Sequence, residues 1–186
     1  MKFIASSYEL EPIDGENVIH VGPCIALSQP ATRDTQRISL IAYMGNGTIS
    51  PALLKHAISE GFRTWDGPVY VASRQLPRLE NGNLRFAHEF DFNRLMPTAR
   101  VFIHHGGQNS MMTGLVHAVP QVVCPATMFE RVYNSRSVEK LQAGLYLDQR
   151  LFTSQGLRKA VEQLITDPRY AENARHAGAN LLALGG

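Results

Sequence analysis

The sequence predicts an α/β protein with a Rossmann-like parallel sheet that carries helices on both faces. Short apolar runs rich in Val and Ile alternate along the chain with stretches of helical periodicity, which is the pattern of βαβ units. The chain has 186 residues, of which 44% are hydrophobic and 18% charged, a composition typical of globular domains. Because the sequence shows no internal repeat and no linker, we expect residues 1–186 to form a single domain.

The expected strands are short. They lie at residues 18–22, 38–45, 67–73, 84–90, 100–105, 121–125 and 145–147. The run ISLIAYMG at 38–45 is the strongest of them, because β-branched and aromatic residues fill it and a Gly-Asn-Gly turn closes it.

Helical patterns fill the gaps between these strands. They lie at residues 51–62, 92–99 (a short helical turn), 109–118 and 130–142, from 154 to a stop at Pro168, and from there to the C-terminus. Pro51 suits a first helical position, Ser154 suits an N-cap, and Gly144 stands just past the end of the helix at 130–142.

Charge, hydropathy and cysteine content exclude several function classes. The formal net charge is +2 with scattered arginines, so no nucleic-acid-binding surface is expected. No apolar run approaches the roughly 20 residues that a membrane span needs, and the N-terminus lacks the apolar core of a secretory signal. Cys24 and Cys124 are the two cysteines and lie far apart, so we expect no disulfide framework and a cytoplasmic location.

A segment with two histidines and two glycines joins a predicted strand to a predicted helix. It reads VFIHHGGQNS from Val101 to Ser110. Three interpretations are open at this point: a metal site, an anion-binding cradle, or an ordinary tight turn. The metal site is the weakest, because His104 and His105 are neighbours on a strand and point to opposite faces.

The anion-binding interpretation follows from where the segment lies. Ligands of open parallel sheets bind at the carboxyl ends of the strands. There the glycines would permit a sharp turn and close approach of a ligand. The amides of Gln108, Asn109 and Ser110 would fall at the start of a helix, where free N–H groups favour an anion. Asn109 and Ser110 could also cap that helix.

The same stretch resembles the donor-binding signature of nucleotide-sugar glycosyltransferases with the GT-B fold. The resemblance is to the family of the UDP-glucosyl- and glucuronosyltransferases and the bacterial antibiotic (macrolide and enediyne) glycosyltransferases. The matching residues are His105-Gly106-Gly107, Ser110, Ala118-Val119-Pro120, Cys124-Pro125 and the segment FERVYNSRSV at 129–138. The segments NVIHVGP at 17–23, LIAYMGNGT at 40–48 and LMPTARVFIHHGG at 95–107 extend the resemblance over nearly the whole chain.

The resemblance implies a role for each matching residue. The donor diphosphate would be bound by His105, Gly106, Gly107, Gln108, Asn109 and Ser110 from one side, and by Gly45, Asn46, Gly47 and Thr48 from the other. The sugar would face Glu130 and Arg131, and the ribose would lie near Thr113. The base would lie against the loop from Glu89 to Phe92, with Glu89 and Phe90 as the expected contacts. His104 would pack or bond inward.

Two departures from the family pattern bear on the donor. The family often has Glu where Thr113 stands, and that Glu accepts hydrogen bonds from the ribose hydroxyls. Because a deoxyribose needs this carboxylate less, Thr113 favours a dTDP-sugar over a UDP-sugar as the donor. Glu130-Arg131 replaces an Asp-Gln pair. Glu can still accept hydrogen bonds from sugar hydroxyls, whereas Arg only donates and is charged. The candidate donor sugars therefore include a charged or carboxylated one.

The resemblance also implies an inverting transfer that needs no metal and no cofactor. No Asp-x-Asp motif, the metal-holding element of the metal-dependent class, occurs in the sequence. A helix N-terminus, His105 and Ser110 would neutralise the diphosphate instead.

The resemblance is to the C-terminal half of a GT-B enzyme. Residues 1–17 resemble the interdomain connection, and the acceptor domain, which holds the general base of this family, would be another domain in cis or a partner chain in trans. We therefore expect no catalytic residue in this chain, no sugar transfer by it alone, and an exposed apolar surface that favours self-association. The acceptor would be a small molecule or natural product.

Two other functions are weighed beside this one. The first is a non-catalytic nucleotide-sugar-binding subunit of a two-chain glycosyltransferase. The second is a half of a sugar-nucleotide epimerase, which shares the fold, and the signature argues against it.

Overall fold

The structure is a computed structural model that describes residues 1–25, 36–45 and 49–185. The strands in this part of the chain are β1 (Lys2–Ile4), β2 (Val18–His20), β3 (Ser39–Gly45), β4 (Val69–Ser73), β5 (Leu79–Asn81), β6 (Leu84–Ala87), β7 (Ala99–His104), β8 (Gln121–Val123) and β9 (Gly144–Tyr146). The helices are α1 (Pro51–Phe62), α2 (Phe92–Leu95), α3 (Gln108–Val116), α4 (Phe129–Lys140), α5 (Ser154–Thr166) and α6 (Arg169–Ala183), with 3₁₀ turns η1 (Met96–Thr98) and η2 (Gln149–Leu151).

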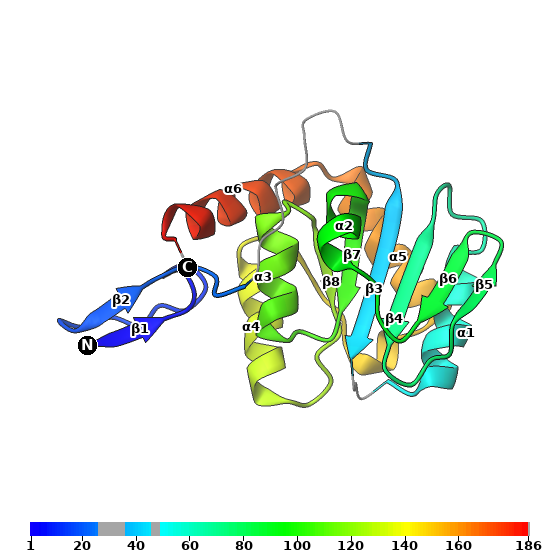
Figure 1. Ribbon diagram of the computed structural model, residues 1–186, viewed down its shortest axis with the longest axis horizontal. Helices are drawn as coiled ribbons and strands as arrows, with labels where there is room; N and C mark the ends of the chain where they lie inside the picture. The colour runs from blue at the N-terminus through cyan, green and yellow to red at the C-terminus, as the bar shows by residue number, and fades with distance from the viewer. Residues whose placement is uncertain (26–35, 46–48, 186) are drawn as a thin grey trace.

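The main sheet has the strand order β5-β6-β4-β3-β7-β8-β9 (Figure 1). Its pairs are parallel except for the pairing of β5 with β6. The chain starts this sheet at β3, builds outward through β4 and β6, and then crosses to β7 on the other side of β3. This is the doubly wound order, and it places a topological switch point between β3 and β7.

Helices cover both faces of this sheet, as the sequence predicted (Figure 1). On one face, α1 and α5 pack on alternate strand residues, among them Leu40, Val101 and Ile103. On the other face, α3, α4 and α6 enclose a second core around Met111 and Leu115. The period-2 alternation along the strands is what divides the apolar side chains between the two layers.

Helix α6 lies directly on α3. Its buried residues are Leu181 and the small Ala174, Ala177 and Gly178. A Cβ at Gly178 would collide with the backbone oxygen of Leu115. The close approach therefore requires glycine at this position, and it anchors the far end of the helix whose beginning forms the candidate site.

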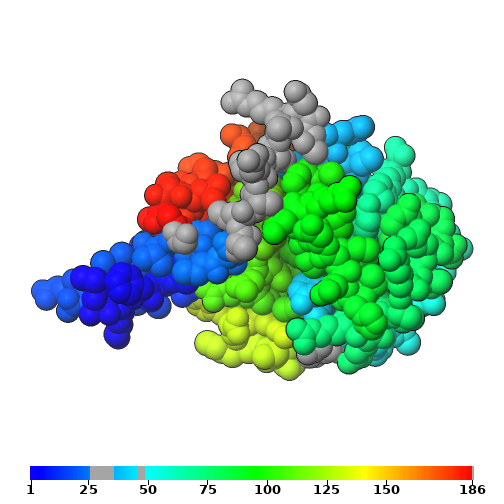
Figure 2. Space-filling view, viewed as in Figure 1, coloured from blue at the N-terminus to red at the C-terminus, as the bar shows by residue number. Residues whose placement is uncertain are grey.

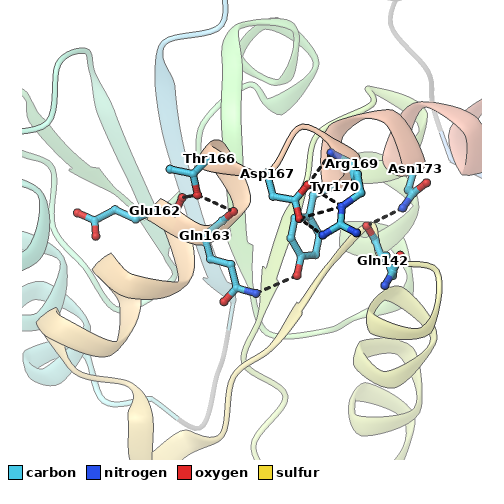
Figure 3. Close-up of polar contacts among 8 residues, drawn as sticks. All are labelled: Gln142, Glu162, Gln163, Thr166, Asp167, Arg169, Tyr170 and Asn173. Carbon is cyan, nitrogen blue, oxygen red and sulfur yellow. Dashed lines mark hydrogen bonds and ion pairs between the residues drawn. The ribbon is translucent and has the colours of Figure 1, made fainter.

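The connection between α5 and α6 is a sharp turn with polar contacts (Figure 3). Arg169 and Asp167 form an ion pair with a nitrogen–oxygen distance of 2.7 Å. Gln163 donates to the Tyr170 hydroxyl at 2.9 Å, and Asn173 donates to the backbone oxygen of Gln142 at 3.3 Å. Pro168 stands in this turn, where the sequence predicted a helix stop.

Two predicted helix ends were wrong in detail. The N-cap of α5 is Thr153, whose hydroxyl accepts from the Gly156 amide at 3.0 Å, and Ser154 is the first helical residue. After α4 the left-handed residue is Gln142 with φ +52°, whereas Gly144 already belongs to β9. A Cβ at Gly144 would collide with the backbone oxygen of Gln121, so this glycine serves close strand packing.

The N-terminal segment forms an arm outside the main sheet (Figures 1 and 2). The predicted strand at 18–22 is β2, which pairs in parallel with β1 in a separate two-stranded sheet. The base of the arm is held to the body at Leu10, which is buried and whose backbone oxygen accepts from the Tyr133 and Ser137 hydroxyls at 3.1 and 3.2 Å.

Candidate functional site

The candidate site lies at the carboxyl ends of β3 and β7, where the sheet topology reverses. Tyr43 of β3 pairs in register with His104 of β7, so the segment that follows β7 emerges beside the end of β3. In doubly wound sheets this is where ligands bind.

The turn after β7 depends on Gly106. Its φ is +86°, a conformation that favours glycine, and a Cβ there would lie 2.8 Å from the backbone oxygen of Arg131. The buried Asn134 of α4 donates to the Gly106 oxygen at 2.9 Å. The start of α4 therefore fixes the turn from one side.

His105 folds back onto this turn. The Gly107 amide donates to His105 Nδ1 at 3.0 Å, so Nδ1 is an acceptor and the ring proton is on Nε2. Partial burial, and after it the nearby Arg131 cation, lower the pKa of His105 below its ordinary value. At neutral pH His105 therefore presents a neutral Nε2–H donor, and this atom faces Gly45, since a Cβ on Gly45 would lie 2.9 Å from it.

Helix α3 contributes backbone amides. Its N-cap is Gly107, with no side-chain cap hydrogen bond, so the prediction that Asn109 or Ser110 caps the helix was wrong. Both lie in the first turn instead. The first backbone bond of the helix is from Met111 to Gly107 at 3.0 Å. The amides of Gln108, Asn109 and Ser110 find no acceptor among the described residues, and together with the helix dipole they favour an anion.

His104 points inward, as the family resemblance implied, and is fully buried. The Gly106 amide donates to its Nδ1 at 3.1 Å, and its Nε2 donates to Gln121 Oε1 at 2.6 Å. Gln121 in turn donates to the Met111 oxygen at 3.1 Å. Burial lowers the pKa of His104 to about 3. This neutral chain of hydrogen bonds ties the glycine turn, β8 and the first turn of α3 into one rigid unit.

Two adjoining cavities lie in front of this unit. The larger, about 510 Å³, is lined by Tyr43, Arg74, His88, Glu89, Phe90, Phe92, Phe102, Asn109, Ser110 and Thr113. The smaller, about 380 Å³, is lined by Tyr43, His105, Gly107, Gln108, Asn109, Ser110 and Glu130. One cavity is aromatic and the other is lined by hydrogen-bond donors, which suits a nucleoside joined to a diphosphate.

The structure brings most of the predicted site residues to these cavities. The residues predicted for ribose and base, Thr113, Glu89 and Phe90, line the larger one. Those predicted for the diphosphate line the smaller one from His105 to Ser110, except Gly106, which is buried and shapes the turn.

Five predicted residues behave differently from expectation or lie outside the described part of the chain. The Gln108 side chain donates to the Ala5 oxygen at 3.0 Å, so only its backbone amide remains for a ligand. Arg131 is half-buried beside the turn and is absent from the lining residues of both cavities, whereas Glu130 lines the smaller one. Asn46, Gly47 and Thr48 lie outside the described residues.

Sequence reasoning missed four cavity residues: Tyr43, Arg74, His88 and Phe102. Tyr43 and Phe102 sit on neighbouring strands and face the same side of the sheet, which a search for polar motifs does not detect. A signal existed for Arg74, because it directly follows the strand β4 and so lies at the same sheet edge as the histidines.

The described residues contain no group of three or more His, Cys, Asp or Glu side chains that could hold a metal ion. The same part of the chain contains no helix long and apolar enough to cross a membrane.

Comparison with known families decides the assignment. The model of the Erythromycin biosynthesis protein CIII-like (EryCIII-like) C-terminal domain matches residues 65–184. The chain belongs to this family. The match runs from the residues before β4 to the end of α6 and includes the whole segment from His105 to Arg131. The resemblance to antibiotic glycosyltransferases of the GT-B fold is thereby confirmed.

The curated relatives include several sugar transferases of Streptomyces. The aclacinomycin-T 2-deoxy-L-fucose transferase of Streptomyces galilaeus is 36% identical over 104 residues, which are 55% of this chain and 23% of the relative. The 10-deoxymethynolide desosaminyltransferase of Streptomyces venezuelae is 28% identical over 156 residues, 80% of this chain and 35% of the relative. The chain thus spans about a quarter to a third of these relatives' length.

Solved structures show the same fold. The glycotransferase of kitacinnamycin superposes with a TM-score of 0.83 at 23% identity, over 99% of this chain and 51% of its own. At this identity the likeness shows the fold, which is one half of a GT-B architecture.

Proposed function

We propose that the chain is the nucleotide-sugar donor-binding half of an inverting, metal-independent glycosyltransferase that acts on a small-molecule acceptor. One observation carries the proposal: three free amides at the start of α3 and the Nε2–H of His105 line one cavity, directly beside an aromatic cavity of nucleoside size. No other part of the described chain combines free amides, a neutral imidazole donor and aromatic walls.

The proposed pose follows from the two linings. The base and ribose would occupy the larger cavity against Phe90 and Phe92. The diphosphate would lie over the first turn of α3, and the sugar would extend toward Glu130, whose carboxylate can accept from sugar hydroxyls.

The chemistry this site supports is stabilisation of the leaving group. When an acceptor oxygen displaces the nucleoside diphosphate from the anomeric carbon, negative charge develops on the diphosphate. Preorganised amides and the His105 donor lower the energy of that charge without needing to reorganise. A single displacement inverts the anomeric carbon. The proton of the acceptor hydroxyl would go to a base in the acceptor half, supplied in cis or by a partner chain.

We further propose a dTDP-linked deoxysugar as donor. Thr113 lines the nucleoside cavity where a carboxylate would favour a ribose, and the two relatives are named for 2-deoxy-L-fucose and desosamine transfer. The free Cys24 and Cys124 fit a reducing cytoplasm.

Isothermal titration calorimetry of the chain with dTDP and UDP, in the presence of a chelator, tests the proposal. We expect binding with chelator present and the same affinity after magnesium is added. Replacing His105 by Ala should lower the affinity for dTDP about tenfold or more, as expected for the loss of one hydrogen bond to a charged group. Binding that requires added magnesium or manganese would refute the metal-independent site, and no binding under either condition would refute the function.

A further inference from the structure

The strand residue Tyr43 stands between the two cavities. Tyr43, Asn109 and Ser110 line both of them. Asn109 and Ser110 belong to the α3 turn already described, whereas Tyr43 comes from β3, on the opposite side of the switch point. Among the described side chains of β3, Tyr43 is therefore the one that lies at the junction of the nucleoside and diphosphate cavities.

Aromatic neighbours hold the Tyr43 ring from two sides. The Phe92 ring lies 5.3 Å from it, centroid to centroid, in an edge-to-face arrangement, and the His105 ring lies 5.5 Å from it. The ring is half-buried between them, so its direction is fixed before any ligand arrives.

The Tyr43 hydroxyl and His105 Nε2 flank the same point in space. A Cβ built on Gly45 would lie 3.5 Å from Tyr43 Oη and 2.9 Å from His105 Nε2. Because Gly45 has no side chain, nothing from this residue occupies the space between the two polar atoms. The Tyr43 hydroxyl and the His105 Nε2–H can therefore both donate to one anionic group that lies between them.

The Tyr43 hydroxyl makes no hydrogen bond with any described residue. Of the other tyrosines, Tyr133 donates to the Leu10 oxygen and Tyr170 accepts from Gln163, whereas the Tyr8, Tyr70 and Tyr146 hydroxyls, like that of Tyr43, have no partner among the described residues. A buried tyrosine hydroxyl normally finds a partner. Tyr43 differs from the half-buried Tyr70 in that it lines both cavities, so its partner is to be sought in the ligand.

We propose that Tyr43 Oη donates a hydrogen bond to the donor diphosphate beside His105 Nε2, so that the anion is held from β3 as well as from α3. This inference rests on the proposed function and deepens it. It adds a ligand-binding residue from outside the histidine–glycine signature, on the strand that begins the sheet.

The variant Tyr43→Phe tests this, because it removes the hydroxyl and keeps the ring between Phe92 and His105. We expect dTDP affinity to fall about tenfold to a hundredfold, the loss of one hydrogen bond to a charged group. Affinity for thymidine, which has no phosphate, should be unchanged. The thermal unfolding midpoint should also be unchanged, since no internal hydrogen bond is lost.

Tyr70→Phe is the matched control. Tyr70 lies on the neighbouring strand β4 with its ring edge-on to Phe90 at 5.3 Å, and it is absent from the linings of both cavities. We expect wild-type dTDP affinity in this variant. Equal dTDP affinity of wild type and Tyr43→Phe, or an equal loss for thymidine and dTDP, would overturn the inference while leaving the proposed function intact. A wild-type chain that binds no nucleoside diphosphate would overturn both.

Discussion

The neighbouring residues His104 and His105 have different roles because their side chains point to opposite faces of the sheet. His105, which directly follows β7, presents a hydrogen-bond donor to the cavities, and His104, the last residue of β7, is buried in a neutral hydrogen-bond chain with Gln121. The alternation along a strand predicted that the two histidines point to opposite faces, and the family resemblance implied that His104 is the one that points inward. The sequence did not predict Gln121 as partner, because that contact joins residues 17 apart through the pairing of β7 with β8.

The burial of His104 makes stability depend on pH. The unfolded imidazole takes up a proton near pH 6.5, whereas in the folded chain its pKa is about 3. The contribution of His104 is therefore fully present above pH 6.5 and is lost as the pH falls toward 3, at up to about 1.4 kcal/mol per pH unit. Urea unfolding of wild type and His104→Asn between pH 7 and 4 measures this. We expect the variant to show the shallower dependence, and parallel curves would contradict the buried neutral state.

Thr113 is the residue that bears on the choice between UDP and dTDP. Its hydroxyl donates to the Asn109 oxygen at 2.7 Å, so toward a ligand it can only accept. We predict that wild type distinguishes UDP from dTDP by less than tenfold. Thr113→Glu should favour UDP by roughly 1.5–3 kcal/mol at most, one charge-assisted hydrogen bond to the ribose. Titrating both proteins with both nucleotides provides the comparison. A wild type that already prefers UDP more than tenfold would show that another group reads the 2′-hydroxyl.

Among the elements, α3 and the turn before it carry the site. The sequence predicted the helix to within about two residues, because a glycine pair before an apolar helical pattern is a local signal. The cap was predicted wrongly: Asn and Ser favour N-caps, yet here Gly107 takes that position and leaves the first-turn amides without a side-chain acceptor. The antiparallel β5–β6 pairing was also missed, since β5 is short and exposed and has no apolar alternation.

The glycine turn allows a matched test. Gly106 and Gly82 both have positive φ, of +86° and +59°, but a Cβ at Gly82 would meet nothing within 4 Å. Gly82→Ala should therefore cost only the backbone strain, about 1–2 kcal/mol. Gly106→Ala adds a collision with the Arg131 oxygen and should cost about 2–5 kcal/mol. Chemical denaturation of both variants measures the difference, and equal losses would show that the turn relaxes freely around the new methyl group.

At the scale of the whole molecule, the strand order follows from chain order and from the rules for parallel sheets. The strand–helix alternation predicted the doubly wound fold, and the structure confirms it. The N-terminal arm could not be predicted in this way. It is a separate pair of three-residue strands with an exposed Phe3, and such a pair is marginal alone. The expectation that residues 1–17 connect to an acceptor domain stays a prediction.

The central claim is that the first turn of α3 binds the diphosphate of a nucleotide. It is tested most directly by recording backbone amide NMR signals of the chain while dTDP is added in the presence of a chelator. We expect the largest shifts on Gln108, Asn109 and Ser110 and smaller shifts along the aromatic cavity. A different cavity, at the amino ends of the strands, is lined by Arg37, Arg100 and Arg175. Largest shifts around those arginines, with the signals of the α3 amides unshifted, would contradict diphosphate binding at the first turn of α3.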